Sequence, residues 1–177
     1  SSSQKRLNNG MTCSWSSCLS SSEITLEILL DYTESIYLIG FSFGGTIALD
    51  MMQNYPVKSS VLISPALVPT PTARTIAFRA VRKIAPPIAR RLAPLEDTML
   101  DFMEHVRADA APIQQPVLVM QAKDDPILSM KGFELIRGRA VNSRSAFVQI
   151  ERGGHVLVDS ENAHEVFSRC SDFIKEV

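Results

Sequence analysis

The chain has 177 residues, of which 45% are hydrophobic, enough to build the core of one domain. Its formal net charge is −1, so it lacks the basic balance of a nucleic-acid binder. No apolar run approaches the roughly 20 residues that span a bilayer. We therefore expect one soluble domain with no nucleic-acid partner and no transmembrane segment.

The beginning of the chain differs in composition from the rest. Residues 1–22 contain nine serines, together with Lys5 and Arg6, and no acidic residue. This predicts a disordered or atypical segment, with an organelle-targeting segment as the alternative. The three cysteines of the chain form no CxxC pair and no cluster with histidine. They predict free thiols in the cytoplasm and no metal site.

From Glu23 onward the sequence predicts a partial domain, residues 23–177, in which helices alternate with buried strands. Ile24 and Ile28 lie at helical spacing in a helix that ends near Tyr32. The other expected elements are strands at 36–41, 59–67, 116–122 and 145–151 and helices at 44–55, 129–137 and 161–175. This alternation is typical of an α/β fold with a mostly parallel sheet.

One long segment, at about 69–111, contains no convincing strand. Ile76, Ala80 and Ile84 keep helical spacing there, which predicts a small helical insertion over the sheet. Six basic residues precede its first acid, Glu96: Arg74, Arg79, Arg82, Lys83, Arg90 and Arg91. They are compatible with a surface for anionic lipid or an acidic partner. The alternative is an ordinary solvated helix face whose long stems cover apolar surface.

A G-x-S-x-G pattern occupies Gly40 to Gly44, between a predicted buried strand and a predicted helix. A serine on such a sharp turn projects its oxygen clear of the sheet, as a nucleophile requires. Glycines lack Cβ and let the strand and the helix close around the serine. The alternative interpretation of Ser42 is a residue in a glycine-rich turn with no chemical role.

A serine nucleophile needs a histidine base and an acid that orients the histidine. His155 lies in a "RGGHVL" turn between the last strand and the last helix, whereas His105 and His164 lie within helices and are expected at the surface or in packing contacts. Asp124 and Asp125 both follow the strand at 116–122, where the carboxyl ends of parallel strands gather ligands. We prefer Asp124, and Asp125 stays open at this point. Either aspartate could instead be a turn former.

Four stretches resemble one family of enzymes. They are "IYLIGFSFGG", "YPVKSSVLISPAL", "PVLVMQAKDDPIL" and "RGGHVLVDSENAHEVFSRCSDFIKEV". The family is the α/β-hydrolase superfamily, and the chain is most similar to its small bacterial carboxylesterases and monoacylglycerol lipases. In the family's acid loop an aliphatic residue follows the aspartate after two variable positions, which corresponds to Asp124 and Ile127.

The resemblance implies a serine esterase in which Ser42 attacks an ester, His155 moves the proton, and Asp124 orients His155. The backbone amide of Phe43 would donate to the oxyanion. No metal or organic cofactor is implied. The insertion would be a cap over a hydrophobic acyl or alkyl chain. Thioester or amide hydrolysis on the same triad, and a catalytically impaired binding protein, are the alternatives.

The sequence departs from the family pattern ahead of the serine. Family members carry several strands and a His-Gly oxyanion motif there, and this chain has no His-Gly dipeptide. The second oxyanion donor is therefore unassigned, and we expect the N-terminal part of the fold to be missing. The sheet would then keep an uncovered edge, through which the chain could associate with itself.

Overall fold

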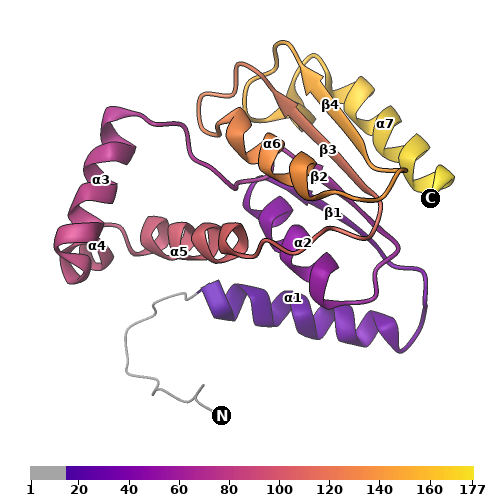
Figure 1. Ribbon diagram of the computed structural model, residues 1–177, viewed down its shortest axis with the longest axis horizontal. Helices are drawn as coiled ribbons and strands as arrows, with labels where there is room; N and C mark the ends of the chain where they lie inside the picture. Colours follow the sequence, from indigo (N-terminus) through magenta and orange to yellow (C-terminus); the bar gives the residue numbers. More distant parts are fainter. Residues whose placement is uncertain (1–14) are drawn as a thin grey trace.

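The computed structural model describes residues 15–177, with side chains from Leu19 onward. Its centre is a four-stranded parallel sheet in the order β1-β2-β3-β4 (Figure 1). The strands are β1 Tyr37–Phe41, β2 Ser59–Ile63, β3 Val117–Ala122 and β4 Ala146–Ile150. The α/β class and the parallel sheet that the sequence predicts are confirmed.

The helices alternate with the strands along the chain. They are α1 Trp15–Leu30, α2 Phe43–Asn54, α3 Ala73–Ile84, α4 Pro86–Leu92, α5 Pro94–Ala108, α6 Met130–Arg139 and α7 Ala163–Glu176, with a 3₁₀ turn at Leu157–Asp159. No described helix is both long enough and apolar enough to cross a membrane. Each predicted strand and helix after 36 is present, with ends shifted by a few residues at most.

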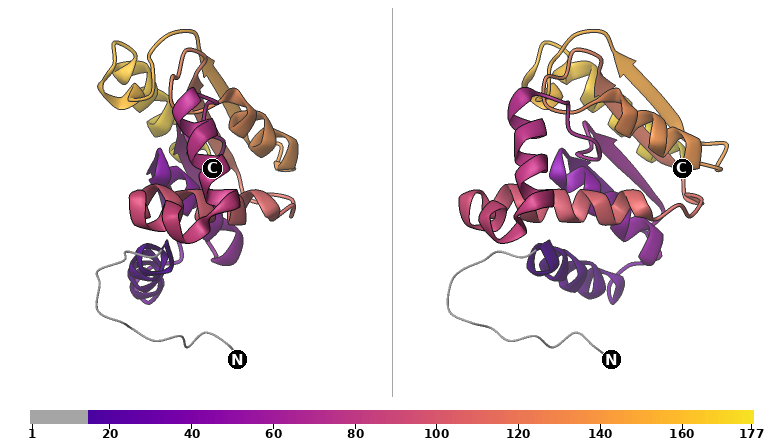
Figure 2. Two further views of the ribbon diagram at one scale, coloured as in Figure 1. Left: turned by 90° about the vertical axis from the view of Figure 1, so that its left-hand side faces the viewer. Right: turned by 60° about the vertical axis from the view of Figure 1, so that its left-hand side comes forward.

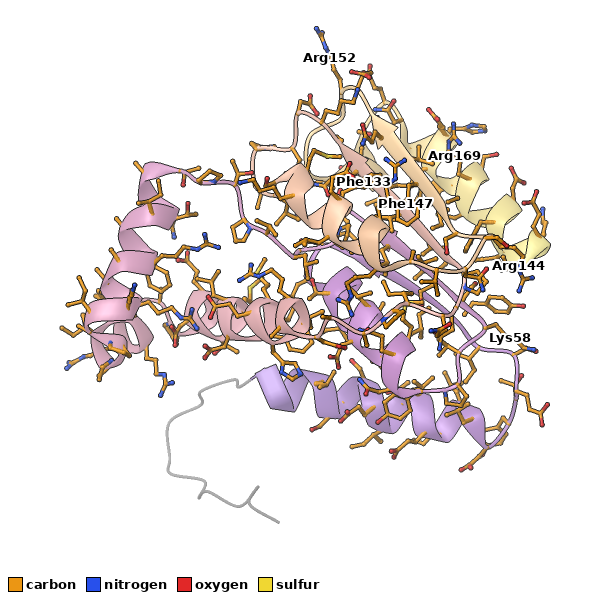
Figure 3. The ribbon with its side chains drawn as sticks, viewed as in Figure 1. Lys58, Phe133, Arg144, Phe147, Arg152 and Arg169 are labelled. Atoms are coloured by element: carbon orange, nitrogen blue, oxygen red, sulfur yellow. The ribbon has the colours of Figure 1, made fainter. Side chains whose placement is uncertain are left out.

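Successive residues of the central strands pack on opposite faces of the sheet, as the pleat requires. Leu62 and Val119 join the core beneath α2 and α6, whereas Val61 and Leu118 pack with α7 on the other face. All residues of β2 and β3 are buried, because helices cover both faces of these strands. Phe133 of α6 and Phe147 of β4 meet edge to face, with ring centroids 5.7 Å apart (Figure 3).

Strand β1 forms an open edge of the described sheet. Its partner is β2, with Gly40 opposite Leu62, and no described strand pairs with its other side. Ile39 is 59% exposed there. Self-association through this edge stays a prediction.

The first helix begins earlier in the chain than the sequence predicts. Helix α1 begins at Trp15 and continues past residue 22, so residues 15–22 are helical; residues 1–14 lie outside the described residues, and the domain boundary at residue 22 stays a prediction. Ile24 and Ile28 are exposed, and Leu26 is the α1 residue that enters the core. The predicted helix is confirmed, and the side of α1 that packs against the core is the one that carries Leu26.

Helices α3, α4 and α5 occupy the segment in which the helical insertion was predicted. Helix α5 packs beside α2, whereas α3 and α4 form one end of the molecule (Figures 1 and 2). Ion pairs connect α3 to α5: Arg74 pairs with Glu96, and Arg82 pairs with Asp97, Asp101 and Glu104. The insertion is thus a separate layer attached to the sheet mainly through α5.

Candidate active site

Ser42 lies on a strained turn between β1 and α2. Its backbone angles are φ 53° and ψ −121°, a conformation that residues with a Cβ rarely adopt. A Cβ on Gly40 would lie 2.4 Å from the carbonyl oxygen of Gly44, so the strand and the helix can approach this closely only with glycine. The Ser42 amide donates to the Ile63 carbonyl at 2.9 Å, which fixes the turn to the neighbouring strand.

His155 reaches Ser42 from the loop after β4. The Ser42 Oγ and the His155 Nε2 are 2.9 Å apart. Gly154, directly before the histidine, has φ 62°, a left-handed conformation that glycine adopts without strain. The Phe41 ring lies beside the imidazole, with centroids 5.3 Å apart, and helps to fix its orientation.

Asp125 holds the other side of the imidazole. Its Oδ2 lies 2.9 Å from the His155 Nδ1, and its Oδ1 accepts from the amides of Ile127 and Leu128 at 2.8 and 2.9 Å. A carboxylate only accepts, so Nδ1 carries the proton and Nε2 is free to accept from the serine hydroxyl.

The Asp125 side chain is fully buried, yet its carboxyl is held in the ionised form. Burial alone would raise the pKa of Asp125, but the hydrogen bonds from His155 and from two backbone amides outweigh it and hold the pKa below its usual value. A buried negative charge at this position stabilises an imidazolium on His155.

The structure corrects the preference for Asp124. The carboxylate that lies beside the His155 imidazole belongs to Asp125. Asp124 is exposed, and its Oδ1 accepts from the amides of Gly153 and Gly154 at 3.1 and 2.9 Å. It supports the backbone of the loop that carries His155 but is not bonded to the imidazole. The two aspartates diverge because the chain turns between them.

A turn signal in the sequence could have identified Asp125. An aspartate before proline accepts readily from amides two and three residues ahead of it. Asp125 makes these bonds with Ile127 and Leu128, so the turn-forming role and the contact with His155 belong to the same residue. The two roles are therefore compatible in one aspartate and are not alternatives.

The chain matches a known protein family. A model of the alpha/beta hydrolase family matches residues 14–169. The chain belongs to the alpha/beta hydrolase family. No curated protein matches it.

Solved structures of this hydrolase fold resemble the chain at low sequence identity. A monoacylglycerol lipase from Paleococcus ferrophilus has a TM-score of 0.71 at 17% identity, over 96% of this chain and 79% of its own. A structure described as LipS and LipT, two metagenome-derived lipolytic enzymes, has a TM-score of 0.77 at 15% identity, over 93% and 74%. Mouse alpha/beta hydrolase domain-containing protein 10 has a TM-score of 0.63 at 15% identity, over 96% and 72%.

A pocket of about 340 Å³ opens beside Ser42 in this hydrolase. Most of its wall is apolar and comes from α3, α5 and the loop after β3: Phe78, Met99, Leu100, Met103, Ile127 and Leu128. Arg74 and Glu96, which pair with each other, contribute polar atoms. The pocket therefore suits an apolar group attached to a reacting carbonyl.

The first amide of α2 is the candidate oxyanion donor named from the sequence. Phe43 begins α2, where amides have no helical acceptor and the helix dipole favours negative charge. Among the described residues we find no acceptor for the Phe43 amide. A second donor stays unassigned.

The other two histidines lie away from Ser42. His105 lies on α5, where its ring stacks on Phe102 and its Nε2 is 3.8 Å from the Asp50 carboxylate. His164 is exposed on α7. Their expected places, at the surface or in packing contacts, are confirmed.

Proposed function

We propose that the chain hydrolyses carboxylic esters through an acyl-enzyme on Ser42, with His155 as the base and Asp125 as the residue that orients His155. The observation that carries the proposal is the continuous chain of hydrogen bonds from Ser42 Oγ to His155 Nε2 and from Nδ1 to Asp125. The serine, the orienting acid and the base lie on three separate loops that follow the carboxyl ends of β1, β3 and β4.

In the proposed reaction Ser42 Oγ attacks the ester carbonyl while its proton moves to His155 Nε2. The buried Asp125 carboxylate stabilises the imidazolium, and the Phe43 amide donates to the oxyanion. Collapse of the tetrahedral intermediate breaks the ester bond, and the leaving alkoxide takes the proton from Nε2. Water then attacks the acyl-enzyme, with His155 again as the base.

The pocket supports a substrate with an apolar acyl or alkyl chain. Its wall of aliphatic, aromatic and methionine side chains begins at Ser42. The similar structures described above, a monoacylglycerol lipase and two lipolytic enzymes, suggest the same class of ester. We infer that a monoacylglycerol or another simple ester of a fatty acid is bound there.

The direct test is the hydrolysis of p-nitrophenyl butyrate and of a monoacylglycerol by the purified chain. Ser42→Ala is expected to remove the activity, and mass spectrometry is expected to find an acyl group on Ser42 during turnover. Activity that survives in Ser42→Ala would overturn the proposal. A fluorophosphonate probe gives an independent readout, since the alternative, a binding protein without catalysis, would leave Ser42 unlabelled.

A further inference from the structure

Helix α3 is amphipathic in the opposite sense to an ordinary surface helix. Ile76, Ala80 and Ile84 form one row along it, and all three are exposed. Phe78, Arg79 and Arg82 are half-buried on the side that faces the protein. No residue of α3 is fully buried. A surface helix normally places its apolar stripe against the core and its charges in water.

The reversal has a structural cause in α5. Asp97, Asp101 and Glu104 lie at helical spacing on α5, and all three bind the Arg82 guanidinium. The side chain of Asp97 is only 5% exposed. These carboxylates fix the charged side of α3 against α5, so the apolar row must face outward.

Large apolar side chains continue outward after α3. Ile84 is 83% exposed and Leu92, at the end of α4, is 71% exposed. Ile76, Ile88 and Leu95 are each more than half exposed. We call these five residues the outer apolar face. Figure 1 shows α3 and α4 together at one end of the molecule, on the side opposite to β4 and α7.

The charges beside the outer apolar face are positive. Lys83 and Arg91 are exposed and have no ion pair or hydrogen bond with any described side chain, and Arg90 is 72% exposed. The segment from 73 to 92 contains no acidic residue, and the neighbouring Glu96 is paired with Arg74. A second copy placed on this face by a two-fold axis would bring like charges together, which disfavours self-association here.

We propose that the outer apolar face docks on the surface of an anionic lipid membrane, with Ile84 and Leu92 entering the interface and Lys83 and Arg91 binding headgroup phosphates. Exposed aliphatic residues with flanking cations are what an interfacial helix requires. The opposite side of α3 lines the pocket beside Ser42 through Thr75 and Phe78. An ester that leaves the membrane at this face therefore has a short path to the pocket, and this step alone rests on the proposed function.

The test is the cosedimentation of the full chain with vesicles of phosphatidylcholine, with and without 30% phosphatidylglycerol. The Ser42→Ala variant is used throughout, so that lipid hydrolysis cannot alter the vesicles and the result is independent of catalysis. We expect partitioning onto the anionic vesicles to exceed that onto neutral ones at least about 20-fold, and to weaken with salt.

Two double variants test the two components of the surface. Lys83→Gln with Arg91→Gln is expected to reduce partitioning onto anionic vesicles about 20-fold, and Ile84→Ser with Leu92→Ser to reduce it at least about tenfold. All four positions are exposed and lie outside the pocket beside Ser42, so hydrolysis of a soluble short-chain ester by the Ser42 form should not change.

Matched controls lie elsewhere on the molecule. Lys58 and Arg152 project far from α3 and α4 in Figure 3, and they also have no ion pair within the described chain. Lys58→Gln with Arg152→Gln, and the exposed apolar pair Leu135→Ser with Val141→Ser, should leave partitioning unchanged within about twofold.

Three results would overturn the proposal. They are no binding to either vesicle, equal loss in test and control variants, and equal binding to neutral and anionic vesicles. A concentration-dependent dimer that Ile84→Ser with Leu92→Ser dissociates, without vesicle binding, would instead assign the face to a second copy. Circular dichroism of each variant confirms that it is folded.

Discussion

The sheet and helix α3 are held in place by different interactions. Every residue of β2 and β3 is buried, and both faces of the sheet carry apolar packing. Helix α3 has no fully buried residue and is attached through the ion pairs of Arg74 and Arg82. Apolar packing stabilises the first region, whereas paired charges orient the second.

The two regions also contribute different parts of the candidate site. Loops at the ends of β1, β3 and β4 supply Ser42, Asp125 and His155, whereas α3 and α5 supply much of the pocket wall. We therefore expect changes in the sheet region to alter kcat or global stability and changes in α3 to alter KM. Each of the following predictions separates these effects, beginning with the largest.

The largest difference is expected between two adjacent aspartates. Asp125→Asn removes the charge that stabilises protonated His155 and favours the wrong tautomer, so kcat should decrease by about 10⁴-fold. Asp124→Asn keeps an oxygen that can accept from the amides of Gly153 and Gly154, so kcat should decrease by less than about tenfold. The kcat of ester hydrolysis at saturating substrate is measured for both variants. A reversed order would restore Asp124 as the orienting acid, and equal losses would contradict the assignment of that role to Asp125 alone.

The adjacent aspartates also show what the sequence could and could not predict. The parallel sheet was predictable because its strands are long apolar runs that end at turn residues. Ser42 and His155 were predictable because glycines next to them allow sharp turns. The choice between Asp124 and Asp125 depends on which carboxylate the turn directs inward, and spacing along a strand does not determine that.

The orientation of α3 was unpredictable for a related reason. The spacing of Ile76, Ala80 and Ile84 correctly predicts a helix. The usual inference that such a stripe packs inward fails because carboxylates on α5, a separate helix, bind Arg82. A contact between two helices overrides the pattern of either one.

The second prediction concerns the turn at Ser42. In Gly40→Ala the new Cβ would lie 2.4 Å from a backbone oxygen of Gly44, so the strand and the helix must separate. We expect the free energy of unfolding to decrease by about 3 kcal/mol. Gly44→Ala is the matched control, because a Cβ there meets nothing within 4 Å and helical alanine is favoured by about 0.5 to 1 kcal/mol. Urea denaturation measures the free energy of unfolding of both variants. A similar decrease in the two would contradict the close approach of Gly40 to Gly44.

The third prediction concerns the attachment of α3. Arg82→Gln removes the cation that three carboxylates share, although Asp97 keeps Arg90 and Glu104 keeps Arg107, so α3 should loosen and the pocket wall with it. We expect KM for a long-chain ester to increase about 5- to 10-fold while kcat changes less than about threefold. Amide hydrogen exchange should become faster in residues 73–84 and stay unchanged in β2 and β3.

The control for Arg82 is a surface pair of the same type. Arg137 lies 4.0 Å from Glu134 and both side chains are more than half exposed, so Arg137→Gln should change KM by less than about twofold. Arg82→Gln could instead lower kcat and leave amide exchange in residues 73–84 as slow as in the wild type. That result would show that the position of α3 does not depend on the ion pairs of Arg82.

The smallest predicted effect is the contribution of Asp125 to the pH dependence of the free energy of unfolding. Because the folded pKa of Asp125 lies below its unfolded value, the folded state binds fewer protons, and the stabilisation is fully present above about pH 5. It is lost as the pH falls below about 4 and through the folded pKa. The difference in unfolding free energy between the wild type and Asp125→Asn should therefore shrink as urea denaturation is repeated from pH 6 to pH 3. A difference that stays constant over this range would mean that the carboxyl of Asp125 is not held ionised by His155 and the amides of Ile127 and Leu128.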